Sequence, residues 1–128
     1  MRIGGVVLGM SMLGACASGG APATEGKGML RHAVLFKFKD GTAPANVKEI
    51  ENAFRALPGK IPEIAAFEWG TNNSPEGLAQ GFTHCFFVSF RDAKGREAYL
   101  PHPAHQAFVD VLKPHLDKVL VIDYDATQ

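Results

Sequence analysis

The sequence predicts one small α+β domain in which helices cover one face of a four-stranded antiparallel sheet. Two observations support this fold class. The chain has 128 residues, of which 46% are hydrophobic and 20% charged, as expected for a single globular domain. Alternating and three-to-four-residue apolar patterns then follow one another in the order strand, helix, strand, strand, helix, strand. The domain is expected at residues 29–125.

The first 15 residues are predicted to be a signal peptide. Arg2 supplies a positive charge, and residues 3–13 form an uncharged apolar run that is shorter than the about 20 residues of a membrane-spanning helix. The following Leu-Gly-Ala-Cys sequence resembles a bacterial lipobox, so Cys16 would become the lipidated first residue of the mature chain. Two alternatives remain: a plain secretory signal with a chance cysteine, and a true start at Met29.

A lipidated Cys16 would place the protein in the bacterial cell envelope, with membrane contact through the lipid anchor only. Ala17 rather than Asp at the next position favours the outer membrane, facing the periplasm. Residues 16–28 contain Ala, Gly, Ser, Pro and Thr but no large apolar side chain, so this segment is predicted to be a flexible tether.

Charge and cysteine content exclude two classes of protein. Thirteen basic residues balance thirteen acidic ones, so no broad positive field is present to attract nucleic acid. Cys85 is the only thiol inside the predicted domain, which excludes an intramolecular disulfide framework. We expect Cys85 to be a small buried side chain on a strand.

The first strand is predicted at residues 32–39, where every second residue is apolar or histidine. Its apolar face carries His32, Val34, Phe36 and Phe38. A helix is expected next, with Thr42 as its N-cap and Pro58-Gly59 as its end. The apolar stripe of that helix comprises Val47, Ile50, Phe54 and Leu57.

The second half of the chain supplies three more strands. They are predicted at residues 64–69, 83–90 and 119–124, with a loop at residues 70–81. Two helices, a short one at 92–100 and a longer one at 103–112, precede the last strand. The strand at 83–90 has aromatic residues on both faces, so helices on one face leave apolar side chains on the other. A second copy of the chain is the simplest cover, and we therefore expect a homodimer.

Several ordered motifs resemble those of the stress-responsive dimeric α/β-barrel (Dabb) family. They are Arg31–Asp40, Phe67–Gly70, Ser74–Leu78, Gly81–His84 and Tyr99–His105. The resemblance covers about residues 29–125 and implies a ferredoxin-like sheet that forms a dimeric α/β barrel. Because the family contains stress proteins of unknown chemistry as well as an enzyme, the resemblance does not choose a function.

The same resemblance implies two catalytic residues. In a plant polyketide cyclase of this family, a histidine of the matching His-Pro-Ala-His segment acts as base with help from a tyrosine, and these positions are His105 and Tyr99. Pro103 independently places His105 in a first helical turn, where the positive helix end favours the neutral imidazole that a base requires. Alternatively, His102 and His105 only shape and cap a turn.

Four further residues are predicted to line a ligand pocket: His32, His84, Phe54 and Trp69. Both histidines match pocket residues of the cyclase, and we expect their strands to lie parallel and adjacent so that both face one cavity. Phe54 stands where the cyclase has a tyrosine, which argues against the plant polyketide as substrate. Coenzyme A thioesters also belong to the cytoplasm rather than the envelope.

No metal or other cofactor is expected. His102 and His105 are three residues apart, but Pro103 interrupts the helix between them, and the chain has no CxxC, HExxH or carboxylate cluster. Our leading hypothesis is a dimeric, stress-responsive envelope protein that binds a small apolar ligand. The alternative is a lyase or cyclase that uses His105 as general base.

Overall fold

The computed structural model describes residues 29–127 and confirms the predicted α+β class. The strands are β1 (Leu30–Phe38), β2 (Ile64–Thr71), β3 (His84–Phe90) and β4 (Leu116–Asp125). The helices are α1 (Pro44–Arg55), α2 (Leu57–Lys60), α3 (Ala93–Tyr99) and α4 (Pro103–Leu112), followed by a 3₁₀ turn, Lys113–His115. The predicted signal peptide, Cys16 and the tether lie outside the described residues. Within residues 29–127, no helix is long and apolar enough to cross a membrane.

The four strands form one sheet in the order β2-β3-β1-β4, and every neighbouring pair is antiparallel. The expectation that β1 and β3 lie parallel was therefore wrong. The β1–α1–β2 crossover brings the chain back in the direction of β1, and the β2–β3 connection then reverses it. β3 enters the gap between β1 and β2 and runs against both.

This reversal separates the two strand histidines. His32 lies opposite Val88, near one end of the β1–β3 pair, whereas His84 lies opposite Phe36, near the other end. Both side chains are on the same face of the sheet and both are buried. They do not face one cavity, contrary to the expectation from the sequence.

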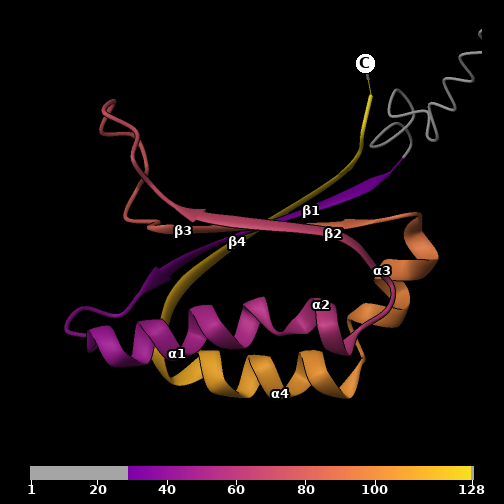
Figure 1. The fold of residues 1–128 in the computed structure, drawn as a ribbon. Coiled ribbons are helices and arrows are strands. Elements are labelled where there is room, and N and C mark those ends of the chain that lie inside the picture. Colours follow the sequence, from indigo (N-terminus) through magenta and orange to yellow (C-terminus); the bar gives the residue numbers. More distant parts are fainter. Residues whose placement is uncertain (1–28, 128) are drawn as a thin grey trace, which may run out of the picture.

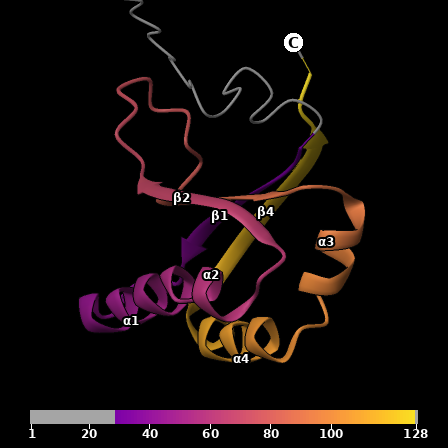
Figure 2. The same cartoon turned by 45° about the vertical axis from the view of Figure 1, so that its right-hand side comes forward.

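The helices cover one face of the sheet only (Figures 1 and 2). α1, α2 and α4 lie beneath the sheet, α3 lies beyond one end of it, and the loop between β2 and β3 rises on the opposite side. We call the uncovered side the open face. Its residues, taken from the strand registers, are Arg31, Ala33, Leu35, Lys37, Ala66, Glu68, Gly70, Cys85, Phe87, Ser89, Lys118, Leu120, Ile122 and Tyr124. Leu120, Ile122 and Tyr124 are 40%, 52% and 47% exposed, so apolar side chains of β4 face solvent there.

The core between sheet and helices is largely aromatic. Phe54 of α1 stacks on Phe86 of β3 with ring centroids 4.2 Å apart and planes at 3°. Phe36 and Phe108 pack against the same pair, at 5.4 Å from Phe86 and 4.7 Å from Phe54 respectively. All four side chains are at least 95% buried. Offset aromatic packing of this kind adds about 0.5–1.5 kcal/mol per pair to the gain from burial.

Two predicted helix ends differ in the structure. Thr42 does not cap α1: its hydroxyl donates to the Lys39 carbonyl at 2.6 Å, and Ala43 is the N-cap, without a side-chain hydrogen bond. Pro44 begins the helix instead, because a proline needs no hydrogen bond for its nitrogen in the first turn. For the same reason Pro58 is accommodated in the first turn of the short helix α2, which begins at Leu57, and it does not end all helical structure.

α3 is positioned by a cap and a close contact. The Asp92 carboxylate accepts a hydrogen bond from the Gly95 backbone N–H at 3.1 Å. Gly95 packs against Phe90 so closely that a Cβ atom at this position would lie 3.3 Å from the Phe90 Cβ. The helix is thereby held against the end of β3, which directs Tyr99 into the interior.

Candidate functional site

A cavity of about 460 Å³ lies between the helix-facing side of β1 and β4, the end of α3, and α4. This volume is within the range of about 300–1,000 Å³ typical of small-molecule sites. Most of its walls are apolar. The lining residues are His32, Val34, Phe36, Phe54, Tyr99, Leu100, His105, Phe108, Val109, Leu112, Lys113, Leu116, Val119, Val121 and Asp123. The structure therefore brings together four of the six residues predicted for the site: His105, Tyr99, His32 and Phe54.

The segment before α4 positions His105. His102 has an extended backbone (φ −60°, ψ 135°), as predicted for a residue before proline, and His105 lies in the first turn of α4. The Nδ1 atom of His102 accepts a hydrogen bond from the Ala104 N–H at 3.0 Å. His102 is thus an N-cap residue, as one of the two sequence-based alternatives proposed, and it does not line the cavity.

His105 makes a hydrogen bond that fixes its tautomer. Its Nδ1 lies 2.9 Å from the Leu100 carbonyl oxygen, which can only accept, so Nδ1 carries the proton. In the neutral ring the lone pair is then on Nε2. The Gln106 side chain donates to the same carbonyl at 3.0 Å and helps to hold it in place. A neutral histidine with a free Nε2 at a cavity wall has the geometry of a general base.

The surroundings of His105 favour its neutral form. Burial lowers the pKa of His105, and repulsion from His32 and His102 acts in the same direction. The hydrogen bond to Leu100 opposes this effect but does not reverse it. His105 therefore remains able to accept a proton at mildly acidic pH.

Tyr99 lies between the two cavity histidines. Its ring centroid is 4.4 Å from that of His105 and 5.8 Å from that of His32. Tyr99 and His105 therefore contact each other through their rings. Burial raises the pKa of Tyr99, so its hydroxyl stays protonated near neutral pH and can donate to a ligand oxygen.

His32 belongs to a polar chain that the sequence did not reveal. Its Nδ1 lies 2.6 Å from Asp123 Oδ1, and Arg96 donates to the other carboxylate oxygen at 3.0 Å. Asp123 lines the cavity from β4, and Arg96 holds it from α3. One feature of the sequence could have indicated Asp123: it shares a strand face with Val119 and Val121, where an acidic residue needs a partner.

The two remaining predicted ligand residues lie elsewhere. His84 and Trp69 stack on each other with centroids 6.2 Å apart and planes at 8°, and neither lines the cavity of His105. The aromatic rings of Phe36, Phe54 and Phe86 occupy the core between the two positions. Of the residues predicted for the pocket, His84 and Trp69 thus form a separate pair.

His84 is buried with an acidic partner. Its Nδ1 is 2.7 Å from the Thr83 hydroxyl, and its Nε2 is 3.5 Å from Glu51 Oε2 on α1. Within the described residues, Nε2 has no partner at hydrogen-bond geometry. The buried Nε2 therefore lies near the Glu51 carboxylate of α1 without a hydrogen bond to it.

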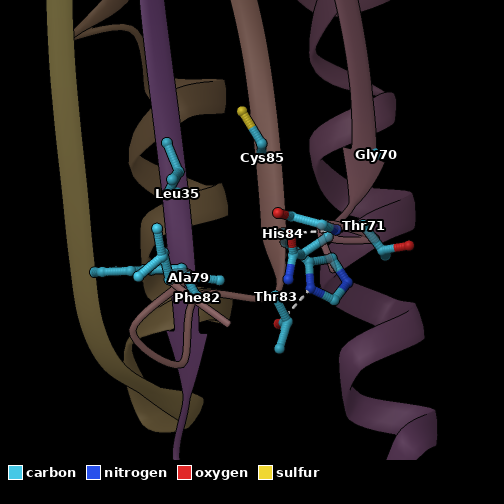
Figure 3. Close-up of a pocket in the computed structure, with 11 residues that line it drawn as sticks. Leu35, Gly70, Thr71, Ala79, Phe82, Thr83, His84 and Cys85 are labelled. Carbon is cyan, nitrogen blue, oxygen red and sulfur yellow. Dashed lines mark hydrogen bonds between the residues drawn. The ribbon is translucent and has the colours of Figure 1, made fainter. Parts of the chain in front are cut away.

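A second hollow, of about 410 Å³, lies on the open face beneath the β2–β3 loop (Figure 3). Leu35 and Cys85 come from neighbouring strands, and Ala79 and Phe82 of the loop lie beside them. Cys85 is only partly buried, because its side chain points to the open face rather than into the core. Burial, and secondarily the charge of Glu68, raise the pKa of the Cys85 thiol, which therefore stays protonated.

Among the side chains that the structure describes, no three or more His, Cys, Asp and Glu residues converge closely enough to hold a metal ion. Of the histidines that line the cavity, His32 instead bonds Asp123, and His105 bonds the Leu100 carbonyl.

The fold is a ferredoxin-like α+β domain with an apolar cavity between the sheet and the helices. The sequence profile of the stress responsive A/B barrel domain (Dabb) family matches residues 30–126. The chain therefore belongs to the Dabb family.

Two relatives show what the family contains. Over 103 residues the chain is 41% identical to the stress-response A/B barrel domain-containing protein HS1 of Arabidopsis thaliana, covering 80% of this chain and 94% of HS1. Over 95 residues it is 30% identical to olivetolic acid cyclase of Cannabis sativa, covering 74% of this chain and 94% of the cyclase. One relative is thus described by its domain and the other as an enzyme.

A solved structure confirms the fold. A dimeric protein of unknown function with a ferredoxin-like fold from Bacteroides fragilis superposes with a TM-score of 0.65 at 28% sequence identity. The match covers 78% of this chain and 98% of that protein. The predicted ferredoxin-like topology is therefore correct.

The lowered pKa of His105 gives a testable prediction. In an NMR titration, the ring protons of His105 should titrate below the ordinary histidine value of about 6.5. Because the unfolded chain then binds more protons than the folded one, the free energy of unfolding should fall as the pH drops below that value. His105→Asn should reduce this dependence, measured by urea unfolding at several pH values. A midpoint at or above the ordinary value would contradict the prediction.

Proposed function

We propose that this chain is a homodimeric, stress-responsive Dabb protein of the cell envelope that binds a small, mostly apolar compound in the cavity beside His105. The observation that carries the proposal is the cavity itself: about 460 Å³ with apolar walls and a few polar groups at one end. Sites of this composition bind ligands by burial and orient them by a small number of hydrogen bonds.

The arrangement of the walls suggests the chemistry of the ligand. Phe36, Phe54 and Phe108 supply an apolar wall, whereas His105 and the Tyr99 hydroxyl supply polar contacts. A compound with an apolar body and one carbonyl or hydroxyl oxygen matches both parts. A strongly charged compound would lose its hydration without finding a matching ion, because the charged Asp123 is already paired with His32 and Arg96.

The exposed apolar residues of the open face support a homodimer. Leu120, Ile122 and Tyr124 would remain in water in a single chain, whereas packing two open faces against each other would bury them. The dimeric Bacteroides protein of the same fold supports this arrangement.

The envelope location is proposed from the sequence. Leu13-Gly14-Ala15-Cys16 follows an apolar run with the features of a signal peptide, and small residues connect Cys16 to the domain. A lipid on Cys16 would hold the domain at the outer membrane, facing the periplasm.

A second candidate function is catalysis of proton abstraction, as in a lyase or cyclase. The specific observation that favours it is the hydrogen bond from His105 Nδ1 to Leu100, which leaves Nε2 free to act as base. Similarity to olivetolic acid cyclase supports the same role. Phe54 stands where the sequence comparison expects a tyrosine, so we do not extend the proposal to the cyclase's own substrate.

Ligand binding can be tested by filling the cavity. Val121→Trp places a large side chain into the cavity from β4, whereas Lys48→Trp changes an exposed residue of α1 that lies outside the cavity and the open face. Native mass spectrometry of the full chain purified from its host should show a bound small molecule in the wild type and in Lys48→Trp but none in Val121→Trp. A wild-type protein without any copurifying compound would count against the proposal.

The enzyme candidate predicts exchange of a carbon-bound proton. With the copurified compound in D₂O, wild-type protein should accelerate deuterium incorporation, and His105→Gln should slow it by about a hundredfold or more. His102→Asn is the control, because it keeps a capping side chain outside the cavity. If His105→Gln exchanges as fast as the wild type, His105 is not the base.

The anchor predicts a change in fractionation. Cys16→Ser should release the protein from the membrane fraction and abolish labelling with a radioactive or alkyne fatty acid, because the acceptor thiol is lost. Cys85→Ser is the matched control and should remain membrane-bound and labelled. Membrane retention and labelling of Cys16→Ser would refute the lipoprotein proposal.

A further inference from the structure

The open face carries one positive charge in the middle of its apolar residues. Arg31 on β1 is partly buried, and its guanidinium lies 5.7 Å from the centre of the Phe87 ring. The same side chain donates a hydrogen bond to the Ser89 hydroxyl. Within the described residues, no carboxylate forms a salt bridge with Arg31. An arginine on an apolar face without an acidic partner is left with unused hydrogen-bond donors.

One acidic side chain belongs to the same surface. Glu68 on β2 is exposed, and it is the single acidic member of the open face as defined above. Glu68 and Arg31 both line a hollow of about 220 Å³, together with Phe87 and Ser89, yet they make no ion pair in the chain. β3 lies between their strands, and two strand spacings separate β1 from β2 by about 10 Å.

The other positive charges of the open face are placed differently. Lys37 pairs with Asp117 at 3.3 Å, and Lys118 lies on the edge strand β4. Among the described residues of the open face, Arg31 is the central-strand cation without a salt bridge, so a covering molecule would bury it with no acidic partner from its own chain. Burying an arginine is unfavourable unless a carboxylate and hydrogen bonds compensate the loss of its hydration.

A twofold dimer supplies such a carboxylate. In an isologous interface, a contact between two different residues occurs twice, once from each chain. We propose that Arg31 of each chain pairs with Glu68 of the second copy, and that this reciprocal pair sets the register in which two open faces pack. The inference rests on the proposed homodimer and adds the residues that select its geometry. The planar guanidinium is well suited to a carboxylate in such an interface.

Charge reversal gives a test that separates pairing between chains from pairing within one chain. In Arg31→Glu, both positions are acidic, and in Glu68→Arg both are basic. Each variant would repel its own copy, but a mixed dimer of the two restores both contacts between chains. Within either chain of that mixed dimer, residues 31 and 68 still carry like charges.

The experiment uses two full-length chains with different C-terminal tags, coexpressed and purified through one tag. Copurification of the second chain should fall by about tenfold or more for Arg31→Glu with itself and for Glu68→Arg with itself. It should return close to the wild-type level when Arg31→Glu is coexpressed with Glu68→Arg. Lys118→Glu, a charge reversal elsewhere on the open face, should pair with itself like the wild type.

Each outcome has one meaning. If wild-type chains do not copurify, the homodimer proposal itself fails. If wild-type chains pair but the two reversals also self-pair normally, the homodimer stands and the Arg31–Glu68 contact is wrong. Loss in both single variants without recovery in the mixture also overturns the contact, as does an equal loss in Lys118→Glu. Recovery in the mixture shows at the same time that both variants fold.

Discussion

The hydrogen bond between His105 and the Leu100 carbonyl determines the chemistry that the cavity can support. Leu100 is the C-cap residue of α3, and two residues separate it from α4, so the turn between the two helices sets the direction of its carbonyl. Pro103 and the N-cap residue of α4, His102, fix the conformation of this turn. Backbone geometry, rather than a neighbouring charged side chain, therefore sets the tautomer of His105 and the direction of its free nitrogen.

The cavity and the core share their residues. Phe36, Phe54 and Phe108 are at least 95% buried and pack on one another, yet each also contributes to the cavity wall. The cavity thus exists because the aromatic cluster fills one end of the space between sheet and helices and leaves the other end to smaller side chains. Such a site is preorganised by the same packing that stabilises the fold, which reduces the cost of ordering it when a ligand binds.

The sequence predicted local structure and the grouping of nearby residues well, but it failed where strand direction mattered. Apolar periodicity located all four strands, and Pro103 correctly placed His105 in the first turn of α4. The grouping of His32 with His84 was wrong because the alternation of apolar residues along a strand does not show the direction in which the strand runs. β1 and β3 are antiparallel, so the two histidines lie at opposite ends of the pair. Arg96 and Asp123 were missed because they meet across 27 residues and two elements, a contact that no local pattern encodes.

The two cavity histidines share a feature that neither sequence motif suggested. His105 and His32 are both held through Nδ1, one by a carbonyl and the other by the Asp123 carboxylate. Because Nδ1 is engaged in both rings, neither imidazole can turn without losing this hydrogen bond. The two fixed imidazoles lie on either side of Tyr99. Hydrogen bonds therefore hold the polar end of the cavity in place, while packing holds its apolar walls.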